Sequence, residues 1–293
     1  MPDTRLQKFA QILVDHSTQV QKGDPVAITT STEAIPAVKE LYRLILQRGG
    51  NPHVLIDFPG QDELFFQNAD DDQIKFVPLF HKMAFEEFDV LIKIRADENT
   101  RALAAVDPKR QAARQKVIFS LLQAQLRRGA DKSLRWVSSL YPTNAYAMEA
   151  GMGLCDYEDF VYRAMHADES TPDPVAHWQG VKTNQQSIIG RIEGHDRVEL
   201  RGPNVDLSLS IRGRTFNNAC GEHNLPDGEI YTGPVENSAN GWVKYTYPAM
   251  YQGRIVDGIQ LEFEDGKVVQ ASATENEEFL LKMLETDAGA RYI

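Results

Sequence analysis

The densest group of side chains that could do chemistry lies between residues 216 and 235, where the sequence reads FNNACGEHNLPDGEIYTGPV. Within it, the Pro-Asp-Gly run at 226–228 predicts a tight turn, because proline presets one backbone dihedral and glycine permits the next. Glu229 then follows at the start of a short strand, and a carboxylate held there is suited to binding a divalent cation. Charged turns of this kind are also common on surfaces that bind nothing, so the residues by themselves leave both interpretations open.

Other well-known catalytic patterns are absent from the sequence. None of the seven histidines has a tight metal-binding spacing, and there is no G-x-S-x-G nucleophile elbow. The run Gly151–Gly153 begins like a dinucleotide-binding loop, but Asp156 stands where the third glycine is needed. The two cysteines, Cys155 and Cys220, are too few for a disulfide framework, which favours reduced thiols in a cytoplasmic protein.

The elements that must position these side chains begin with short apolar strands that alternate with helices. Strands are predicted at residues 25–30, 53–57, 89–94 and 134–139, with helices at 34–48 and 107–129. This alternation is typical of a mostly parallel sheet flanked by helices, in which ligand sites lie beyond the carboxyl ends of the strands. The predicted core residues of the sheet are Val26, Ile28, Val54, Ile56, Val90 and Ile92.

The apolar periodicity changes after the polar, proline-rich stretch at residues 168–174. A helix is predicted from Pro174 to about Ile189, and period-two alternation follows it, which indicates half-buried strands. Asp265-Gly266 predicts a hairpin turn. The alternating residues are Val205, Leu207, Leu209 and Ile211, then Val243, Tyr245 and Tyr247. We therefore predict an α/β domain at residues 1–170 and an incomplete β-rich (α+β) domain at 171–293.

Two capping boxes are predicted, one from Thr4 with Gln7 and one from Thr274 with Glu277. The second precedes a helix whose apolar residues should form a buried face. These residues are Phe279, Leu280, Met283 and Leu284.

The charge balance narrows the class of partner. Lys and Arg number 31 and Asp and Glu number 42, which gives a net charge of −11. This balance disfavours nucleic acid and anionic membrane surfaces, and it is compatible with divalent metals or small cationic substrates. No apolar run approaches the ~18 residues of a membrane helix, and the N-terminus has no signal-peptide layout.

The turn and its flanks resemble a known family. Leu225–Glu229 (LPDGE) followed by Tyr231–Pro234 (YTGP) is similar to the thermophilic metallo-aminopeptidases, the family of aminopeptidases T, S and II. The supporting stretches occur in the family's order along the chain and are Tyr141–Thr143, Glu149–Met152, Asn240–Trp242 and Ala290–Ile293.

The resemblance implies a cytosolic, homodimeric exopeptidase that removes N-terminal residues from peptides. It implies two adjacent divalent metal ions, zinc, cobalt or manganese, and Glu229 matches the family's first metal-binding glutamate. In the family a Gly-Glu pair follows the stretch that matches residues 291–293, and later two histidines, an aspartate and a tyrosine complete the site. Because this sequence ends at Ile293, we expect a C-terminally truncated chain that lacks most metal ligands and is inactive alone.

Three interpretations follow from these observations. The leading one is a metallo-aminopeptidase, the alternative is a non-catalytic module that keeps the α/β domain for binding or association, and the third is an unrelated α/β enzyme with a small-molecule cofactor. A two-metal hydrolase needs several ligands to hold ions roughly 3.5–4 Å apart. Glu222, His223 and Glu236 are not expected to replace the missing ligands, because neighbouring side chains in a turn rarely converge on one point. We expect the Glu229 carboxylate to be at least partly accessible.

Overall fold

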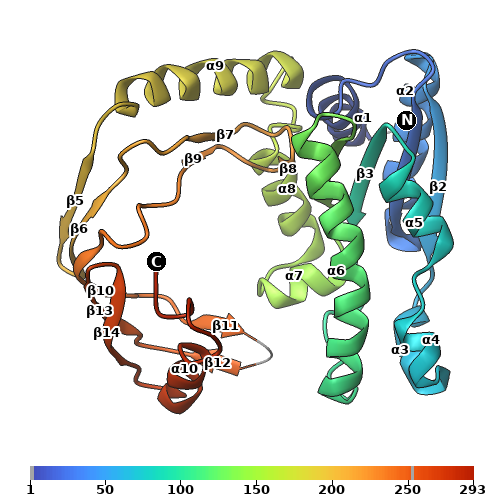
Figure 1. The fold of residues 1–293 in the computed structure, drawn as a ribbon. Coiled ribbons are helices and arrows are strands. Elements are labelled where there is room, and N and C mark those ends of the chain that lie inside the picture. The colour runs from blue at the N-terminus through green and yellow to red at the C-terminus, as the bar shows by residue number, and fades with distance from the viewer. Residues whose placement is uncertain (1–2, 252–253) are drawn as a thin grey trace. The chain divides into compact units, whose positions relative to one another are not determined.

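The computed structural model describes residues 3–251 and 254–293, and the chain divides into two compact units (Figure 1). Unit 1 contains the chain up to residue 184 together with residues 219–229. Unit 2 contains residues 185–218 and 230–293. The segment 219–229 therefore returns to unit 1 after unit 2 has begun. The two domains predicted to meet at residue 170 stay a prediction.

Unit 1 is built on a five-stranded sheet in which all neighbouring strands run parallel. The strand order is β2-β1-β3-β4-β8. The strands are β1 (Pro25–Ser31), β2 (Asn51–Asp57), β3 (Val90–Arg95), β4 (Arg135–Leu140) and β8 (Asn224–Leu225). The predicted parallel sheet is thus confirmed, and the two-residue strand β8, too short to show a periodicity, is added to its edge.

The helices of unit 1 connect these strands. They are α1 (Thr4–Gln11), a π-helical segment (Ile12–Ser17), a 3₁₀ turn (Thr32–Ala34), α2 (Ile35–Gln47), α3 (Gln61–Asn68), α4 (Asp71–Lys75), α5 (Leu79–Glu86), α6 (Pro108–Ala130), α7 (Asn144–Glu149), α8 (Leu154–Ala164) and the first part of α9 (Pro174–Ile192). Sequence signals account for several ends. Asp107 caps α6 through the Lys109 amide, with Pro108 in the first turn, and Gly49 follows α2 with φ of +81°.

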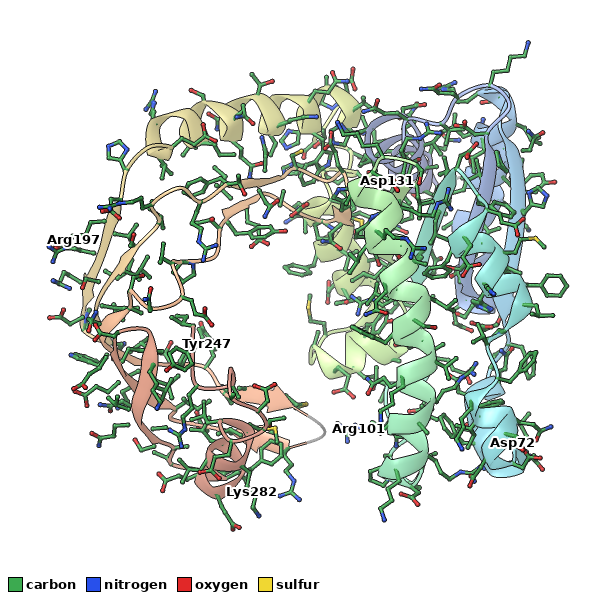
Figure 2. All side chains as sticks on the ribbon, viewed as in Figure 1. Asp72, Arg101, Asp131, Arg197, Tyr247 and Lys282 are labelled. Atoms are coloured by element: carbon green, nitrogen blue, oxygen red, sulfur yellow. The ribbon has the colours of Figure 1, made fainter. Side chains whose placement is uncertain are left out.

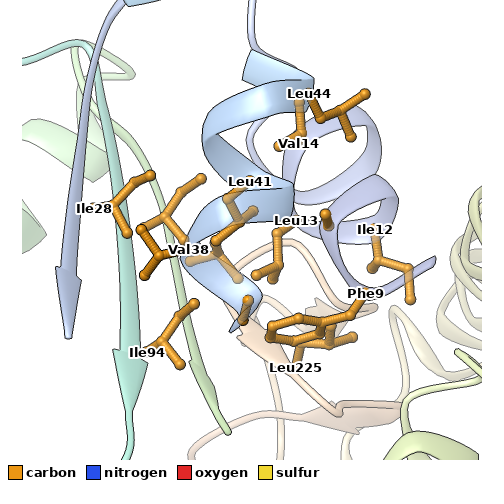
Figure 3. Packing of buried hydrophobic residues seen from close by; sticks show 14 of the residues in the cluster. Phe9, Ile12, Leu13, Val14, Ile28, Val38, Leu41, Leu44, Ile94 and Leu225 are labelled. Atoms are coloured by element: carbon orange, nitrogen blue, oxygen red, sulfur yellow. The ribbon is translucent and has the colours of Figure 1, made fainter. Parts of the chain in front are cut away.

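Each face of the parallel sheet has its own apolar core. On one face, α1, the π-helical segment and α2 pack against β1 and β3, and Figure 3 shows Val38 of α2 beside Ile28 of β1 there. On the other face, Leu91 packs with buried residues of α5, α6 and the position just before β4, which are Ala84, Phe85, Leu121 and Leu134. Two covered faces are the physical reason for near-continuous apolar strands in a parallel sheet.

Two expectations for unit 1 are wrong in detail. Ile56 is 38% exposed instead of buried, because β2 is the edge strand of the sheet and lacks a neighbour beyond it. The predicted capping box of Thr4 and Gln7 does not form. Asp3 caps α1 instead, since its carboxylate accepts a hydrogen bond from the Arg5 amide at 2.9 Å, one residue before the expected cap.

Unit 2 centres on an antiparallel sheet of order β14-β13-β10-β6-β5. The strands of this sheet are β5 (Arg197–Gly202), β6 (Val205–Ser210), β10 (Asn240–Lys244), β13 (Gln260–Glu264) and β14 (Lys267–Ser272). The predicted hairpin turn is confirmed, with φ of +48° at Asp265 and +79° at Gly266. A β-carbon on Gly266 would lie 1.8 Å from the Glu236 carbonyl oxygen, so this turn position requires glycine.

Unit 2 also contains the antiparallel pair β11 (Ala249–Tyr251) and β12 (Arg254–Val256) and the helix α10 (Glu277–Met283). Two further short strands, β7 (Asn217–Ala219) and β9 (Glu229–Tyr231), pair with each other at the points where the chain leaves one unit and enters the other. Within the described ranges, no helix is long and apolar enough to cross a membrane.

Three expectations for unit 2 are corrected. The alternation through Tyr245 and Tyr247 does not mark a buried strand, because β10 ends at Lys244 and Tyr247, labelled in Figure 2, is 84% exposed. Asn276, not Thr274, precedes α10 as its N-cap residue. The apolar face of α10 is only half-buried, since no residue of that helix is fully covered.

Candidate functional site

The candidate turn lies on a segment that is anchored to the edge of the parallel sheet. β8 pairs with β4, the Ser138 amide donates a hydrogen bond to the His223 carbonyl at 2.8 Å, and the Ser139 hydroxyl donates to the Leu225 carbonyl at 2.7 Å. Leu225 is 2% exposed and belongs to the larger apolar core, where Figure 3 shows it beside Phe9. The backbone just before the turn is therefore held by both hydrogen bonds and burial.

The start of the same segment is held by the π-helical residues. His16 Nε2 lies 2.8 Å from the Cys220 carbonyl oxygen, and the Ser17 hydroxyl donates to the Gly221 carbonyl at 2.5 Å. Gly221 has φ of +82°, and a β-carbon there would lie 3.1 Å from the indole ring of Trp178. Only glycine combines this backbone conformation with so close an approach. Residues more than 200 positions apart in the chain thus fix the segment.

The predicted turn at 226–228 is present. The Leu225–Pro226 peptide bond is cis, and Gly228 has φ of +122°. The Gly228 amide donates to the Ala219 carbonyl at 3.0 Å, and the Gly221 amide donates to the Asp227 carboxylate at 3.1 Å. These bonds tie the two ends of the segment together and place Glu229 at the first position of β9.

Two carboxylates therefore leave the turn together. Glu229 is exposed, as expected, whereas Asp227 is half-buried. Burial raises the pKa of Asp227, and the nearby negative charge of Glu229 adds to this rise, while the Gly221 and Gly228 amides act in the opposite direction. Asp227 lies in the predicted polar cluster, but sequence reasoning assigned no role to it. The signal that could have found it is its place in the Pro-Asp-Gly turn, where an Asp side chain commonly accepts hydrogen bonds from nearby backbone amides.

The other polar residues of this cluster are engaged elsewhere. Glu222 forms an ion pair with Lys182 at 2.5 Å, and the His223 ring stacks on Trp136 with centroids 4.7 Å apart. Glu236 belongs to unit 2. Among residues 3–251 and 254–293, no three His, Cys, Asp or Glu side chains come together as a metal site. The described residues therefore do not by themselves fit a two-metal centre, which needs several ligands.

A pair of stacked histidines lies beside Trp178 in unit 1, and we expect it to make the stability of the protein sensitive to acid. The rings of His166 and His177 lie with centroids 3.6 Å apart, and both meet the Trp178 ring edge-on. Burial lowers the pKa of His177, and the positive charge of His166 lowers it further. The unfolded chain then takes up a proton before the folded chain does, so the free energy of unfolding should fall as the pH drops below ~6.5.

Urea unfolding of the whole chain at pH 8 and pH 5.5 measures this effect. The His177→Gln variant should show a smaller loss of stability across the same interval. An equal pH dependence in the variant and the wild type would contradict the assignment to this pair.

Unit 1 is an α/β unit with a parallel sheet, and the acidic turn is anchored to the edge of that sheet. The model of the thermophilic metalloprotease (M29) family matches residues 2–293. This chain belongs to that family, whose members are metal-dependent proteolytic enzymes. The family resemblance inferred from the turn is therefore confirmed.

Individual relatives agree with the family and with the fold. Aminopeptidase 2 of Geobacillus stearothermophilus is 27% identical over 99% of this chain and 75% of its own length. Aminopeptidase T of Thermus thermophilus is 24% identical over 98% of this chain and 75% of its own length. The solved structure of wild-type AmpT from Thermus thermophilus superposes with a TM-score of 0.80 at 21% identity, covering 98% of this chain and 76% of that one. The chain thus spans about three quarters of the length of these relatives.

Proposed function

We propose that this protein is a metal-dependent aminopeptidase that removes N-terminal residues from peptides. The observation that carries the proposal is the match of the metalloprotease family over residues 2–293. The names of the relatives, aminopeptidase 2 and aminopeptidase T among them, support the exopeptidase class. Zinc, cobalt or manganese is the proposed metal, with two ions per site in the full-length family.

We further propose that Glu229 is a metal ligand. Its support is geometric, because the preceding backbone is held to the sheet at Ser139 and tied to Ala219, and the carboxylate is exposed. The neighbouring Asp227 carboxylate adds negative charge on the same short segment. A divalent cation would be attracted to this pair, and the anchored backbone lowers the entropy that is lost when the ligand is fixed.

Metal removal tests the proposed function. In protein whose two-metal site is complete, stripping with a chelator should reduce hydrolysis of leucine p-nitroanilide to the background rate, and activity should return with zinc, cobalt or manganese in proportion to the metal bound. Bound metal is measured by mass spectrometry on the same samples. Undiminished hydrolysis by metal-free protein would overturn the proposal.

The absence of a three-ligand group among the described residues favours a second candidate, a non-catalytic binding or association module. The metal experiment separates the two. No bound metal and no turnover with any of the three ions would favour the module, whereas metal-dependent turnover would exclude it.

We also infer that the chain forms a homodimer. Large apolar side chains remain exposed on α3, α5 and α6 of unit 1, and exposed apolar surface of this kind marks association sites. The side chains are Leu64, Leu79, Phe80, Met83, Ile118 and Phe119.

Light scattering tests the dimer. The wild type should have twice the monomer mass of 33.0 kDa, and Phe80→Glu, at a side chain that is 73% exposed, should shift the protein toward the monomer. Phe160→Glu is the matched control, because Phe160 is 59% exposed on α8, outside this group. A wild-type monomer at micromolar concentration would contradict the inference.

We propose a cytoplasmic location because both cysteines are free thiols. Cys155 is exposed and Cys220 is buried, and neither is in a disulfide. Burial raises the pKa of Cys220 to about 11, so this thiol stays protonated and unreactive near neutral pH. Reduced thiols are typical of cytosolic proteins.

A further inference from the structure

A cleft of about 390 Å³ lies at the carboxyl ends of β1, β2 and β3 in unit 1. Its walls come from the last residues of these strands and from the loops that follow them, and none of the residues 219–229 lines it. Ligands of open α/β sheets bind at this edge, and the volume lies within the range of small-molecule sites.

The floor of the cleft is a polar row on one face of the sheet. Thr29, Lys93 and Ser138 are register partners across β1, β3 and β4, and all three line the cleft. Side chains two residues apart share a face of a strand. One step back on this face, the partners are Ala27, Leu91 and Trp136, which lie in the apolar core. On this face of the sheet, the side chains of three adjacent strands therefore change from apolar to polar at the same register position.

Lys93 is a cation without a counter-charge. Its ammonium donates to Gln125 Oε1 at 2.9 Å and lies over the rings of Phe85 and Trp136. No described carboxylate forms an ion pair with it, and Arg95 follows on the same face. Burial lowers the pKa of Lys93, and the charge of Arg95 lowers it further. An uncompensated, partly desolvated cation is costly, and an anionic group in the cleft would stabilise it.

Gln125 carries a second unsatisfied group beside this ammonium. Its side chain is fully buried, and its Nε2 has no hydrogen-bond partner. Buried donors without partners are rare in folded proteins, so the amide that accepts from the Lys93 ammonium is itself incompletely satisfied.

Negatively charged side chains also line the cleft. Asp57, Asp62 and Asp97 all line it. Burial raises the pKa of Asp62, and the negative charges of Asp57 and Asp97 add to this rise, while the positive charge of Arg114 acts against it. The three carboxylates do not form a metal site in the described part of the chain, since no three such groups are placed to hold one ion. An organic cation can meet such dispersed carboxylates without a fixed coordination geometry.

We propose that this cleft binds a free α-amino acid, through its carboxylate at Lys93 and Arg95 and its ammonium group at Asp57 and Asp62. The hydroxyl groups of Thr29 and Ser138 supply further hydrogen bonds on the floor. The cationic floor and the acidic side chains of the cleft are complementary to a zwitterion, and a ligand with only one of the two charges leaves the other set uncompensated. The proposal does not depend on the proposed peptidase activity.

Isothermal titration calorimetry of the whole chain with L-leucine tests the proposal, with a chelator present throughout so that binding at any metal centre is excluded. Leucinamide lacks the carboxylate and 4-methylpentanoate lacks the ammonium group, so each should bind at least about tenfold more weakly, the equivalent of one lost charge contact of about 1.4 kcal/mol. Lys93→Met keeps the side-chain volume and should weaken L-leucine binding by at least as much. Lys39→Met, at an exposed lysine on α2, is the matched control and should bind like the wild type.

Several outcomes would overturn the proposal. They are no binding of L-leucine, binding unchanged in Lys93→Met, and equal binding of 4-methylpentanoate or inorganic phosphate, which would show a site for anions alone. If Lys93→Met does not fold, as judged by its thermal unfolding, Arg95→Gln and Asp62→Asn replace it. Both side chains line the cleft. Each variant should weaken binding of L-leucine, while Asp62→Asn leaves binding of 4-methylpentanoate unchanged.

Discussion

In protein whose two-metal site is complete, replacing Glu229 by glutamine is expected to lower metal affinity and peptide hydrolysis by at least about 100-fold. The change keeps the shape of the side chain and removes its charge. Loss of a residue that only supports a metal ligand already costs about 10–100-fold, so loss of a ligand carboxylate should cost at least the upper end of that range. Metal affinity by calorimetry and leucine p-nitroanilide hydrolysis are the two measurements. Folding should be unaffected, because Glu229 is exposed and its carboxylate makes no ion pair with a described residue.

Glu236→Gln is the matched control for this experiment. It makes the same chemical change a few residues away, in unit 2, and should leave both measurements unchanged. Asp227→Asn is informative as well, because its carboxylate accepts the Gly221 amide, so a loss of metal affinity there would extend the site to both acids of the turn. Full metal affinity and full activity in Glu229→Gln would show that the family assignment of this residue is misplaced.

Truncating Leu225 to alanine should lower the free energy of unfolding by about 2–5 kcal/mol, the usual cost of removing a buried leucine side chain. Leu225 is 2% exposed and lies in the core formed by α1, α2 and the sheet, next to Phe9 in Figure 3. It is also the residue just before the turn, and β8 is only two residues long. We therefore expect the variant to loosen the segment 219–229 and to disturb the placement of Glu229.

Urea unfolding measures the stability of the Leu225→Ala variant, and hydrogen exchange of the amides in residues 219–229 measures the loosening. Leu46→Ala on α2 is the control, because Leu46 is 53% exposed and its truncation should cost little. If both variants lose the same stability, burial of Leu225 does not anchor the segment. If Leu225→Ala is destabilised but exchange in the segment is unchanged, the hydrogen bonds to Ser138 and Ser139 are sufficient to hold it.

Local sequence chemistry determined much of the fold. The strands around Ile28 and Ile92 are apolar because both faces of their sheet are covered, and this pattern is legible without knowledge of the neighbours. Asp107 with Pro108 begins α6, and Asp265-Gly266 makes the hairpin of unit 2, because these residues act on the backbone dihedrals next to them. The same local logic predicted the Pro-Asp-Gly turn and the exposed carboxylate of Glu229 after it.

Tertiary structure decided what depends on partners far along the chain. The exposure of Ile56 follows from the position of β2 at the sheet edge, and the position of Gly221 follows from its contact with Trp178 and from the hydrogen bond of its carbonyl to Ser17. Neither the exposure of Ile56 nor the position of Gly221 leaves a periodic signal in the sequence. Each depends on how segments far apart in the chain are arranged in space.

The acidic turn at residues 226–229 and the cleft around Lys93 show the same difference between what the sequence determined and what the tertiary structure decided. The sequence alone determined that an acidic turn exists at residues 226–229, since its residue types and order are local. Only the tertiary structure raised the pKa of Asp227 by burial and engaged Glu222 with Lys182. Likewise, nothing in the sequence distinguishes Lys93 from other lysines. Its place in the cleft follows from the parallel register that aligns it with Thr29 and Ser138. The physical reason is that desolvation and Coulomb interactions depend on distance in space, whereas backbone preferences depend on adjacent residues.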